Sequence, residues 1–409
     1  MVSGMRRTGF LSLTVAAAVM LMCGCGAANS KLSEEEAHRI VIWHDKEDAV
    51  TGVLEEKLKE LEPEVTIVLE KKSDLTESLK MVGNNPSAAP DMYFFAHDKI
   101  GVYAEMGILS PITDIIPAEE LSGYMQNTLE AATYKGEIYQ LPIYYETLLF
   151  LYNRRYMSDD AVPETTEELY DYMQEKTGGG HYGFVEQHST PYYAAGWING
   201  FGGRILNDDG TPGLNSDAVI AALAYHKKFA DLMPGETEYA TVNTLFNEGM
   251  AHATIGGPWL IPTVRESGID VGAAPMPVID ETGTPIAPYM GVQGIQVLQY
   301  AASNKTESVE KVLRALMDPE VQISLAQASG CAPASEECYT MPEIADDEIV
   351  MTMKETAEHA VPMPNLPEMD VMWTVVGNLL TDVNMSDEDV AESAEKAQEE
   401  ALSLIKTMQ

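Results

Sequence analysis

Residues 91–101 read DMYFFAHDKIG, and this stretch joins the two patterns that decide the fold. Residues 91–95 form a short apolar and aromatic run, which is typical of a buried β-strand. Three ionisable side chains follow it directly, namely His97, Asp98 and Lys99, before an amphipathic stretch begins. A buried strand that ends in a carboxylate and a cation indicates that these side chains have a role outside the core.

The chain around this stretch alternates between strand and helix patterns. Residues 39–43 (RIVIW), 65–69 (VTIVL) and 92–95 are predicted strands, and 49–62 and 74–82 are predicted helices between them. Alternation of this length predicts a doubly wound, mostly parallel α/β sheet. Further helices are predicted at 164–176, 189–200, 216–232, 241–250 and 306–328 (broken by Pro319), and a final helix opens at Ser386.

In open α/β sheets, ligands bind beyond the carboxyl ends of the strands. Asp98 and Lys99 come directly after such an end, so we expect them to face a cleft.

The length and the net charge of the chain limit the number of lobes and the kinds of ligand to be expected. A chain of 409 residues exceeds what one hydrophobic core usually supports, so two lobes are expected. The net charge is −39, from 25 basic and 64 acidic side chains. Such a field repels nucleic acid and anionic membranes and is compatible with a neutral or cationic ligand.

The first residues are expected to be an export signal. Arg6 and Arg7 precede an apolar run, residues 10–22, which is too short to span a bilayer comfortably. The following CGCG resembles the end of a bacterial lipoprotein signal peptide, so residues 1–24 are predicted to be removed and Cys25 to carry the lipid. Cys23 is the alternative acceptor, and an uncleaved anchor is the alternative to both. Without residues 1–24 the net charge is −41, from 23 basic and 64 acidic side chains.

The two remaining cysteines, Cys331 and Cys338, are predicted to form a local disulfide in an oxidising compartment. A catalytic cysteine is the competing interpretation. Neither the cysteines nor the histidines have metal-ligand spacing, so no metal and no cofactor is expected. The acidic stretch NDDGTPG at 207–213 lacks the alternating ligands of a calcium loop and is predicted to be a turn.

Five stretches, in order, carry a resemblance to a known family. They are IVIWHDK (40–46), PDMYFFAHDKIGVYAEMGILSPI (90–112), YKGEIYQLPIYYETLLFLYN (134–153), FNEGMAHATIGGPW (246–259) and MPNLPEMDVMW (363–373). The chain resembles the extracellular sugar-binding proteins of ABC importers, most closely the maltose/maltodextrin-binding family.

This resemblance implies a periplasmic-binding-protein-like fold with two α/β lobes, each a mostly parallel sheet flanked by helices, and a ligand cleft between the lobes. The chain would cross between lobes near 143–146, 290–293 and 345. A tether, 25–38, would precede the first lobe. The N-terminal lobe would contain 39–144 and 293–345, and the C-terminal lobe 145–292 and 346–409.

The family's motifs also imply the ligand-binding residues. Carboxylates and cations would bind sugar hydroxyls, and aromatic rings would stack on the apolar faces of the sugar rings. The residues that match these roles are Asp45, Lys46, Phe95, Asp98, Lys99, Glu146, Tyr192, Trp259, Met363 and Trp373. Trp43 and Trp197 are predicted to be core residues.

The chain departs from the family pattern at several of these places. Phe95 stands where the family has tryptophan, and Lys99 where it has arginine, which exchanges a planar fork for a point charge. Thr190, Thr374 and Gly377 replace a glutamate, a tyrosine and an arginine. These exchanges remove polar contacts but keep the aromatic ones, so we expect α-glucan binding with altered preference for oligosaccharide length or linkage.

The resemblance therefore predicts a receptor, and not an enzyme. It would be a monomer that captures malto-oligosaccharide outside the cell, closes around it, and delivers it to a permease whose ATPase is a separate subunit. A receptor for another sugar or small solute is the alternative. A secreted glycosidase with Asp98 and Glu146 as its carboxylate pair is the third hypothesis.

Overall fold

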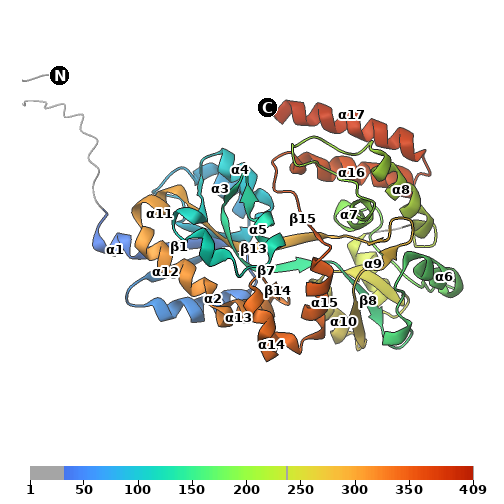
Figure 1. Ribbon diagram of the computed structural model, residues 1–409, viewed down its shortest axis with the longest axis horizontal. Coiled ribbons are helices and arrows are strands. Elements are labelled where there is room, and N and C mark those ends of the chain that lie inside the picture. Colours follow the sequence, from blue (N-terminus) through green and yellow to red (C-terminus); the bar gives the residue numbers. More distant parts are fainter. Residues whose placement is uncertain (1–31, 236–237, 409) are drawn as a thin grey trace, which may run out of the picture.

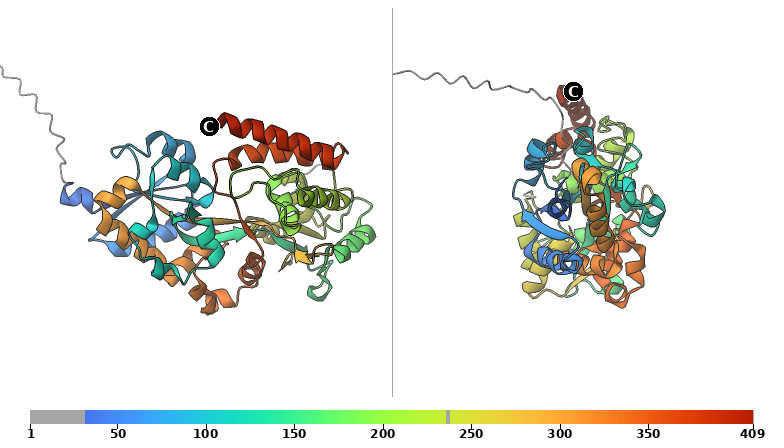
Figure 2. Two further views of the ribbon diagram at one scale, coloured as in Figure 1. Left: turned by 45° about the horizontal axis from the view of Figure 1, so that its top comes forward. Right: turned by 90° about the vertical axis from the view of Figure 1, so that its left-hand side faces the viewer.

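The computed structural model describes residues 32–235 and 238–408, which form two lobes side by side (Figures 1 and 2). The predicted signal peptide and Cys25 lie outside the described residues. Across the described residues, no helix has both the length and the apolar character needed to cross a bilayer. The two-lobed α/β architecture expected from the sequence is confirmed.

The N-terminal lobe is built on parallel strands at one side of a larger mixed sheet. Residues 34–138 contain α1 (Glu34–Ala37), β1 (Arg39–His44), α2 (Asp48–Leu58), β2 (Thr66–Lys71), α3 (Leu75–Val82), β3 (Met92–Ala96), the 3-10 turn η2 (His97–Lys99), α4 (Ile100–Glu105), β4 (Leu109–Ser110), α5 (Gln126–Ala131), β5 (Thr133–Tyr134) and β6 (Glu137–Ile138), and residues 299–345 contain α11 (Gln299–Asn304), α12 (Thr306–Met317), α13 (Pro319–Ser329), β14 (Ala332–Pro333) and α14 (Pro342–Ala345).

The strand and helix patterns of the sequence explain the strand pairing and the helix boundaries of this lobe. β1 pairs in parallel with β2 and with β3, as predicted from their alternation with helices. Val50, Leu54 and Leu58 lie on one face of α2 and are buried, which is the spacing of an amphipathic helix. Pro319 ends one helix and begins the next, because it has no amide hydrogen to donate and Asp318 caps α13.

Two long strands cross from one lobe to the other. They are β7 (Gln140–Thr147) and β13 (Tyr289–Leu298), which pair with each other in antiparallel orientation. β13 also pairs with β3, so the main sheet has the order β14-β7-β13-β3-β1-β2. Figure 1 shows these strands in the middle of the molecule, where the two lobes meet. They form the continuous connection through which the lobes are linked.

The C-terminal lobe differs from the mostly parallel sheet that we expected. Its three-stranded sheet, in the order β10-β8-β9, is antiparallel at both pairings. β8 follows the crossing strand β7 almost directly, and β9 and β10 both run in the direction opposite to it. Residues 149–285 contain β8 (Leu149–Asn153), α6 (Thr166–Lys176), α7 (Pro191–Gly200), α8 (Asp217–Ala230), α9 (Tyr239–Asn247), β9 (Ala253–Gly256), α10 (Ile261–Glu266), β10 (Val271–Ala274), β11 (Val278–Ile279) and β12 (Thr284–Pro285), and residues 348–408 contain α15 (Glu348–Ala357), α16 (Met369–Asn384) and α17 (Val390–Met408).

A short strap returns the chain to the N-terminal lobe before α16. β15 (Val361–Pro362) pairs with β13, and the backbone then contacts the first lobe, where Gly101 N–H donates to Asn365 O at 3.0 Å. The side-chain amide of Asn365 donates to the carbonyls of Ala131 and Thr133. The segment 361–368 thus touches both lobes.

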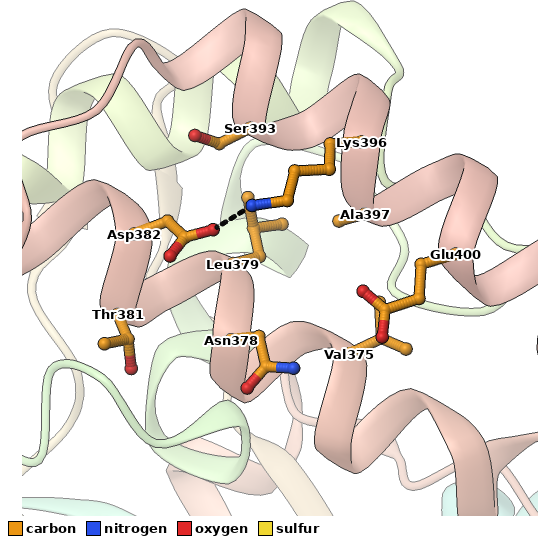
Figure 3. Close-up of a pocket in the computed structure, with 9 residues that line it drawn as sticks. All are labelled: Val375, Asn378, Leu379, Thr381, Asp382, Ser393, Lys396, Ala397 and Glu400. Carbon is orange, nitrogen blue, oxygen red and sulfur yellow. Dashed lines mark hydrogen bonds and ion pairs between the residues drawn. The ribbon is translucent and has the colours of Figure 1, made fainter.

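The two last helices pack against each other on the outside of the C-terminal lobe. Lys396 Nζ of α17 lies 3.1 Å from Asp382 of α16, in a shallow hollow of about 220 Å³ (Figure 3). The final helix begins later than Ser386. Asp389, and not Ser386, accepts the first-turn hydrogen bond, from Glu392 N–H at 3.0 Å.

Candidate functional site

The loop after β1 places a cation and a carboxylate beside the end of β3. Lys46 Nζ lies 2.9 Å from Asp45 Oδ1, and its backbone amide donates to His44 Nδ1 at 3.2 Å. The ammonium group is also 5.2 Å and 5.5 Å from the ring centres of Phe94 and Phe95, within range of a cation–π contact. Lys46 is only 9% exposed, so these neighbours, and not water, surround most of its side chain.

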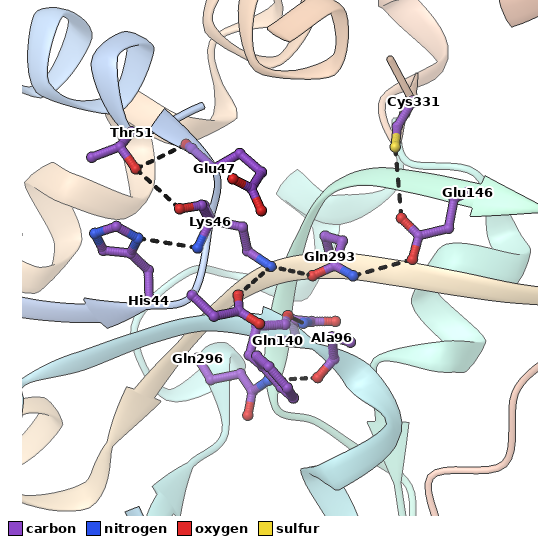
Figure 4. A network of polar contacts seen from close by, with 12 residues as sticks. His44, Lys46, Glu47, Thr51, Ala96, Gln140, Glu146, Gln293, Gln296 and Cys331 are labelled. Carbon is purple, nitrogen blue, oxygen red and sulfur yellow. Dashed lines mark hydrogen bonds and ion pairs between the residues drawn. The ribbon is translucent and has the colours of Figure 1, made fainter. Parts of the chain in front are cut away.

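A glutamine that the sequence analysis missed extends this group to the crossing strands. Gln293 Oε1 accepts from Lys46 Nζ at 2.6 Å, and Gln293 Nε2 donates to Glu146 Oε1 at 3.2 Å (Figure 4). The predicted residues Asp45, Lys46 and Glu146 therefore belong to one polar network. No motif distinguished Gln293, because its partners lie far from it in the sequence.

The pKa of the Glu146 carboxyl group is shifted by its surroundings. Burial raises the pKa of its carboxyl group above the usual value, and the hydrogen bond from Gln293 and the charge of Lys46 act in the opposite direction. Its second oxygen, Oε2, lies 3.6 Å from Cys331 Sγ. An ionised carboxylate with neighbouring donors is a suitable acceptor for hydroxyl groups.

The predicted disulfide is wrong, because Cys331 and Cys338 are both free. The thiol of Cys331 contacts Glu146, whereas Cys338 Sγ lies 3.7 Å from Pro319 O. Between the two cysteines the chain forms β14, which pairs with β7, and the thiols pack into different hydrophobic clusters. Their short separation in sequence therefore does not bring the sulfur atoms together.

The turn after β3 is fixed by His97 and directs charged groups toward the C-terminal lobe. His97 is fully buried, and its Nδ1 accepts from Val292 N–H at 3.1 Å. Its Nε2 is 2.7 Å from Met363 O, so the imidazole joins the turn to the crossing strand and to the strap. Lys99 Nζ lies 3.3 Å from Asp98 and forms a second ion pair with Asp370 of α16.

The sequence analysis also missed Asp370, although its spacing from Trp373 on a helix could have identified it. It lies three residues before Trp373, on the same face of α16. The ion pair from Lys99 thus brings the N-terminal lobe next to the predicted stacking tryptophan.

The predicted aromatic residues of the C-terminal lobe form a row, which is completed by Tyr289, a residue that the sequence analysis missed. Tyr192 lies 6.4 Å from Trp259 and 6.4 Å from Tyr289, measured between ring centres. Tyr289 lies in turn 6.3 Å from Trp373, edge to face. Trp259 is 41% exposed, which is unusual for the largest side chain. Tyr289 is 1% exposed and joins the other rings from below the surface, whereas Tyr192, Trp259 and Trp373 are partly exposed and could be covered by a flat apolar ligand surface.

The row and the polar network are neighbours. Burial raises the pKa of the Tyr192 hydroxyl well above its usual value, and the charge of Glu146 raises it further. Met363, Tyr192 and Trp373 all pack against the same hydrophobic cluster. Asp45, Lys46 and Glu146 thus belong to the polar network, with Phe95 against Lys46, while Tyr192, Trp259 and Trp373 belong to the aromatic row and Asp98 and Lys99 to the ion pair with Asp370.

A larger groove adjoins this site on the strap. It has a volume of about 820 Å³ and is lined by residues of both lobes and of segment 360–368, including Tyr289 and Met363. No group of three or more metal-ligating side chains occurs within 32–235 and 238–408.

The chain is similar to known proteins in both sequence and structure. A sequence model described as "Bacterial extracellular solute-binding protein" matches residues 55–352. The maltotriose-binding protein of Pyrococcus abyssi is 31% identical, over 89% of this chain and 82% of the relative. The galactooligosaccharide-binding protein of Bacillus subtilis is 27% identical, over 97% of this chain and 95% of the relative.

A solved structure is similar over nearly the whole chain. It is a cyclo/maltodextrin-binding protein complexed with maltotetraose, with a TM-score of 0.83 and 26% identity. The similarity covers 93% of this chain and 100% of that one.

Proposed function

Because this chain belongs to the bacterial extracellular solute-binding protein family, we propose that it is the malto-oligosaccharide receptor of an ABC importer. The observation that carries the proposal is the aromatic row Trp259–Tyr192–Tyr289–Trp373 beside the Lys46–Gln293–Glu146 network. Rings that stack on sugar faces and charged groups that bind hydroxyls are what an uncharged oligosaccharide requires. The relative of known structure with maltotetraose bound supports the same ligand class.

The charge of the protein is consistent with such a ligand. A net charge of −41 after removal of the signal peptide disfavours anionic solutes, because their approach is repelled. A neutral sugar needs no countercharge and is not affected.

Binding residues come from both lobes, and this is how the sugar would close the molecule. Asp45, Lys46, Phe95, Asp98 and Lys99 belong to the N-terminal lobe, and Tyr192, Trp259 and Trp373 to the C-terminal lobe. A ligand shifts a conformational equilibrium only through different affinity for the two states, which contacts on both lobes provide. The crossing strands β7 and β13 would act as the hinge. The division into 39–144 plus 293–345 and 145–292 plus 346–409 is part of this proposal.

The receptor would be held at the outer face of the membrane. We propose that Cys25 carries a lipid after removal of residues 1–24, and that residues 25–38 are the tether. The receptor would then work as a monomer and dock on permease subunits served by a separate ATPase. Mass spectrometry of the purified protein, which would detect a lipid on Cys25, tests the anchor.

The function is tested by calorimetry with maltose through maltoheptaose, with isomaltose and cellobiose as controls. We expect maltotriose or a longer glucan to bind more tightly than maltose, and chromatography to recover the sugar intact. The identity to a galactooligosaccharide-binding protein favours one second candidate, a galactooligosaccharide receptor. Binding of β-linked galactooligosaccharides without binding of any malto-oligosaccharide would replace the first proposal by the second. Cleavage of the sugar would show an enzyme instead.

A further inference from the structure

Gln293 lies at an irregularity in the pairing of the two crossing strands. Along β13, Gln293 pairs with Tyr144 of β7, but the next residue, Gly294, pairs with Pro142. One residue of β7 is therefore unpaired, which is the definition of a β-bulge. A side chain at Gly294 could not be accommodated, because its Cβ would be 2.3 Å from Leu141 O. Bulges of this kind redirect side chains and are frequent beside functional sites.

The bulge and a second glycine place Gln293 beside Glu146. Glu146 is two residues from Tyr144 and hence on the same face of β7 as the partner of Gln293. Opposite Glu146 is Gly291, where a Cβ would be 2.8 Å from Glu146 Oε1. The absence of a side chain there leaves room for the carboxylate to lie across β13 and reach Gln293.

Both the oxygen and the nitrogen of the Gln293 side-chain amide form a hydrogen bond. Its oxygen accepts from Lys46 Nζ at 2.6 Å, and its nitrogen donates to Glu146 Oε1 at 3.2 Å (Figure 4). A neutral amide combines an acceptor for the cation with a donor for the carboxylate. A carboxylate at this position would repel Glu146, and an ammonium group would repel Lys46.

We propose that Gln293 is a positioning residue of the sugar site, whose amide holds Lys46 and Glu146 at a fixed separation and so keeps both available to sugar hydroxyls. The inference rests on the proposed function for its ligand, but the geometry of the network does not depend on that ligand. Gln293 connects a loop of the N-terminal lobe to the strand that forms the hinge, so it also couples the site to the crossing.

The chemical consequence concerns the charge of Glu146. Burial raises the pKa of this carboxyl group. Of the groups that lower it, Gln293 has the largest effect, through its hydrogen bond, and the charge of Lys46 has the next largest. Without the amide, the carboxyl group should take up its proton at a higher pH. A protonated carboxyl group loses the acceptor strength of the carboxylate, and the sugar would bind more weakly.

The experiment measures maltotriose affinity by calorimetry between pH 5 and pH 8 for the wild type, Gln293→Ala and Gln293→Glu. At pH 7.5 we expect Gln293→Ala to bind about tenfold more weakly, because a hydrogen bond to a charged group is lost. In both variants the affinity should begin to fall at a higher pH than in the wild type, and most clearly in Gln293→Glu, which adds a like charge. Glu146→Gln should bind weakly at every pH, with no such fall.

A matched control is available on the same strand. Gln296 is buried, and its amide donates to Ala96 O at 3.4 Å, away from Lys46 and Glu146. Gln296→Ala should lower the denaturation midpoint without moving the pH at which affinity falls. A shift equal to that of Gln293→Ala would indicate a general effect of strand disruption and would overturn the proposal.

A ligand-free measurement separates this inference from the proposed function. The titration of Glu146 can be followed by NMR in protein labelled at the glutamate carboxyl carbons, with Glu146→Gln to assign its signal. We expect the midpoint in Gln293→Ala to lie above that of the wild type. An unchanged midpoint overturns the inference even if maltotriose binds. Failure of the wild type to bind any malto-oligosaccharide, with a shifted midpoint, refutes the ligand and leaves the network role established.

Discussion

Lys99, in the turn after β3, forms an ion pair with Asp370 at the start of α16, and this pair joins the N-terminal lobe to the C-terminal lobe. Lys99 also contacts Asp98 at 3.3 Å within its own lobe. Burial opposes the charge of Lys99, but the two carboxylates outweigh it and raise the pKa of the amine. The pair is an interaction that only the approach of both lobes can form.

Replacement of Asp370 should therefore weaken sugar binding by making closure less favourable. For Asp370→Asn we expect a two- to fivefold loss of maltotriose affinity, because a partly exposed ion pair contributes up to about 1 kcal/mol. The loss should diminish at high salt. A double-mutant cycle with Lys99→Ala isolates the coupling between the two residues.

Asp382→Asn is the matched control, because Asp382 lies on the same helix but pairs with Lys396 inside the C-terminal lobe (Figure 3). It should leave the affinity unchanged. An increase of affinity in Asp370→Asn would contradict the expectation, since it would show that Asp370 competes with the sugar for Lys99.

The four tryptophans should respond differently to sugar. Trp197 is fully buried and donates to Glu186 at 3.1 Å, whereas Trp259 is the exposed end of the aromatic row. Replacement of Trp259 by alanine should reduce maltotriose affinity about tenfold, since the contact area of a large apolar side chain contributes about 1.5 kcal/mol or more. It should also remove much of the fluorescence change caused by sugar.

Trp197→Phe provides the comparison for this experiment. The variant should keep the fluorescence response and the affinity while losing stability, because the Nε1–H bond to Glu186 is lost in the core. Fluorescence titration and urea unfolding of both variants check these outcomes. An unchanged affinity in Trp259→Ala would remove this residue from the site.

Much of the N-terminal lobe could be predicted from sequence periodicity. The apolar spacing of α2 and the short apolar strands β1 and β3 are local signals, and so was the break at Pro319. The antiparallel sheet of the C-terminal lobe could not be predicted in this way. In this sheet Leu149 pairs with Gly256 and Asn153 with Val271, and local periodicity carries no information about pairings between residues so far apart in sequence.

The site residues divide in the same way, into those with a local sequence signal and those whose partners lie far away in the sequence. Asp98 and Trp373 lie in recognisable stretches and were predicted, whereas Gln293 was missed because its contact with Lys46 spans 247 residues. The cysteines show the opposite error, since closeness in sequence suggested a bond that the intervening strand prevents.

The free cysteines lead to a direct prediction about redox conditions. In a soluble variant with Cys23 and Cys25 replaced by serine, two thiols per chain should react with a thiol reagent in denaturant. In the native protein the reaction should be slow, because both thiols are buried and burial raises the pKa of each. Reductant should not change the melting temperature, and a clear decrease would show that a disulfide does form.

His97 should make the stability of the protein depend on pH. Its imidazole accepts from Val292 N–H and donates to Met363 O, an arrangement available only to the neutral ring. Burial lowers the pKa of His97 below its usual value, although Asp98 acts in the opposite direction. Below about pH 6.5 the unfolded state therefore binds more protons than the folded state, and stability must decrease as the pH falls toward the lower, folded pKa.

The replacement of His97 tests this argument. At pH 7.5, His97→Ala should lose about 2 kcal/mol of unfolding free energy, because two buried hydrogen-bonding groups lose their partner. At pH 5 the difference between the wild type and the variant should be smaller, since the wild type has by then lost part of the stability that the neutral ring provides. Urea unfolding at both pH values measures this, with His359→Ala, at an exposed position, as the control that should follow the wild type. A difference that stays constant or grows on acidification would show that the imidazole does not couple the turn to the strap in its neutral form.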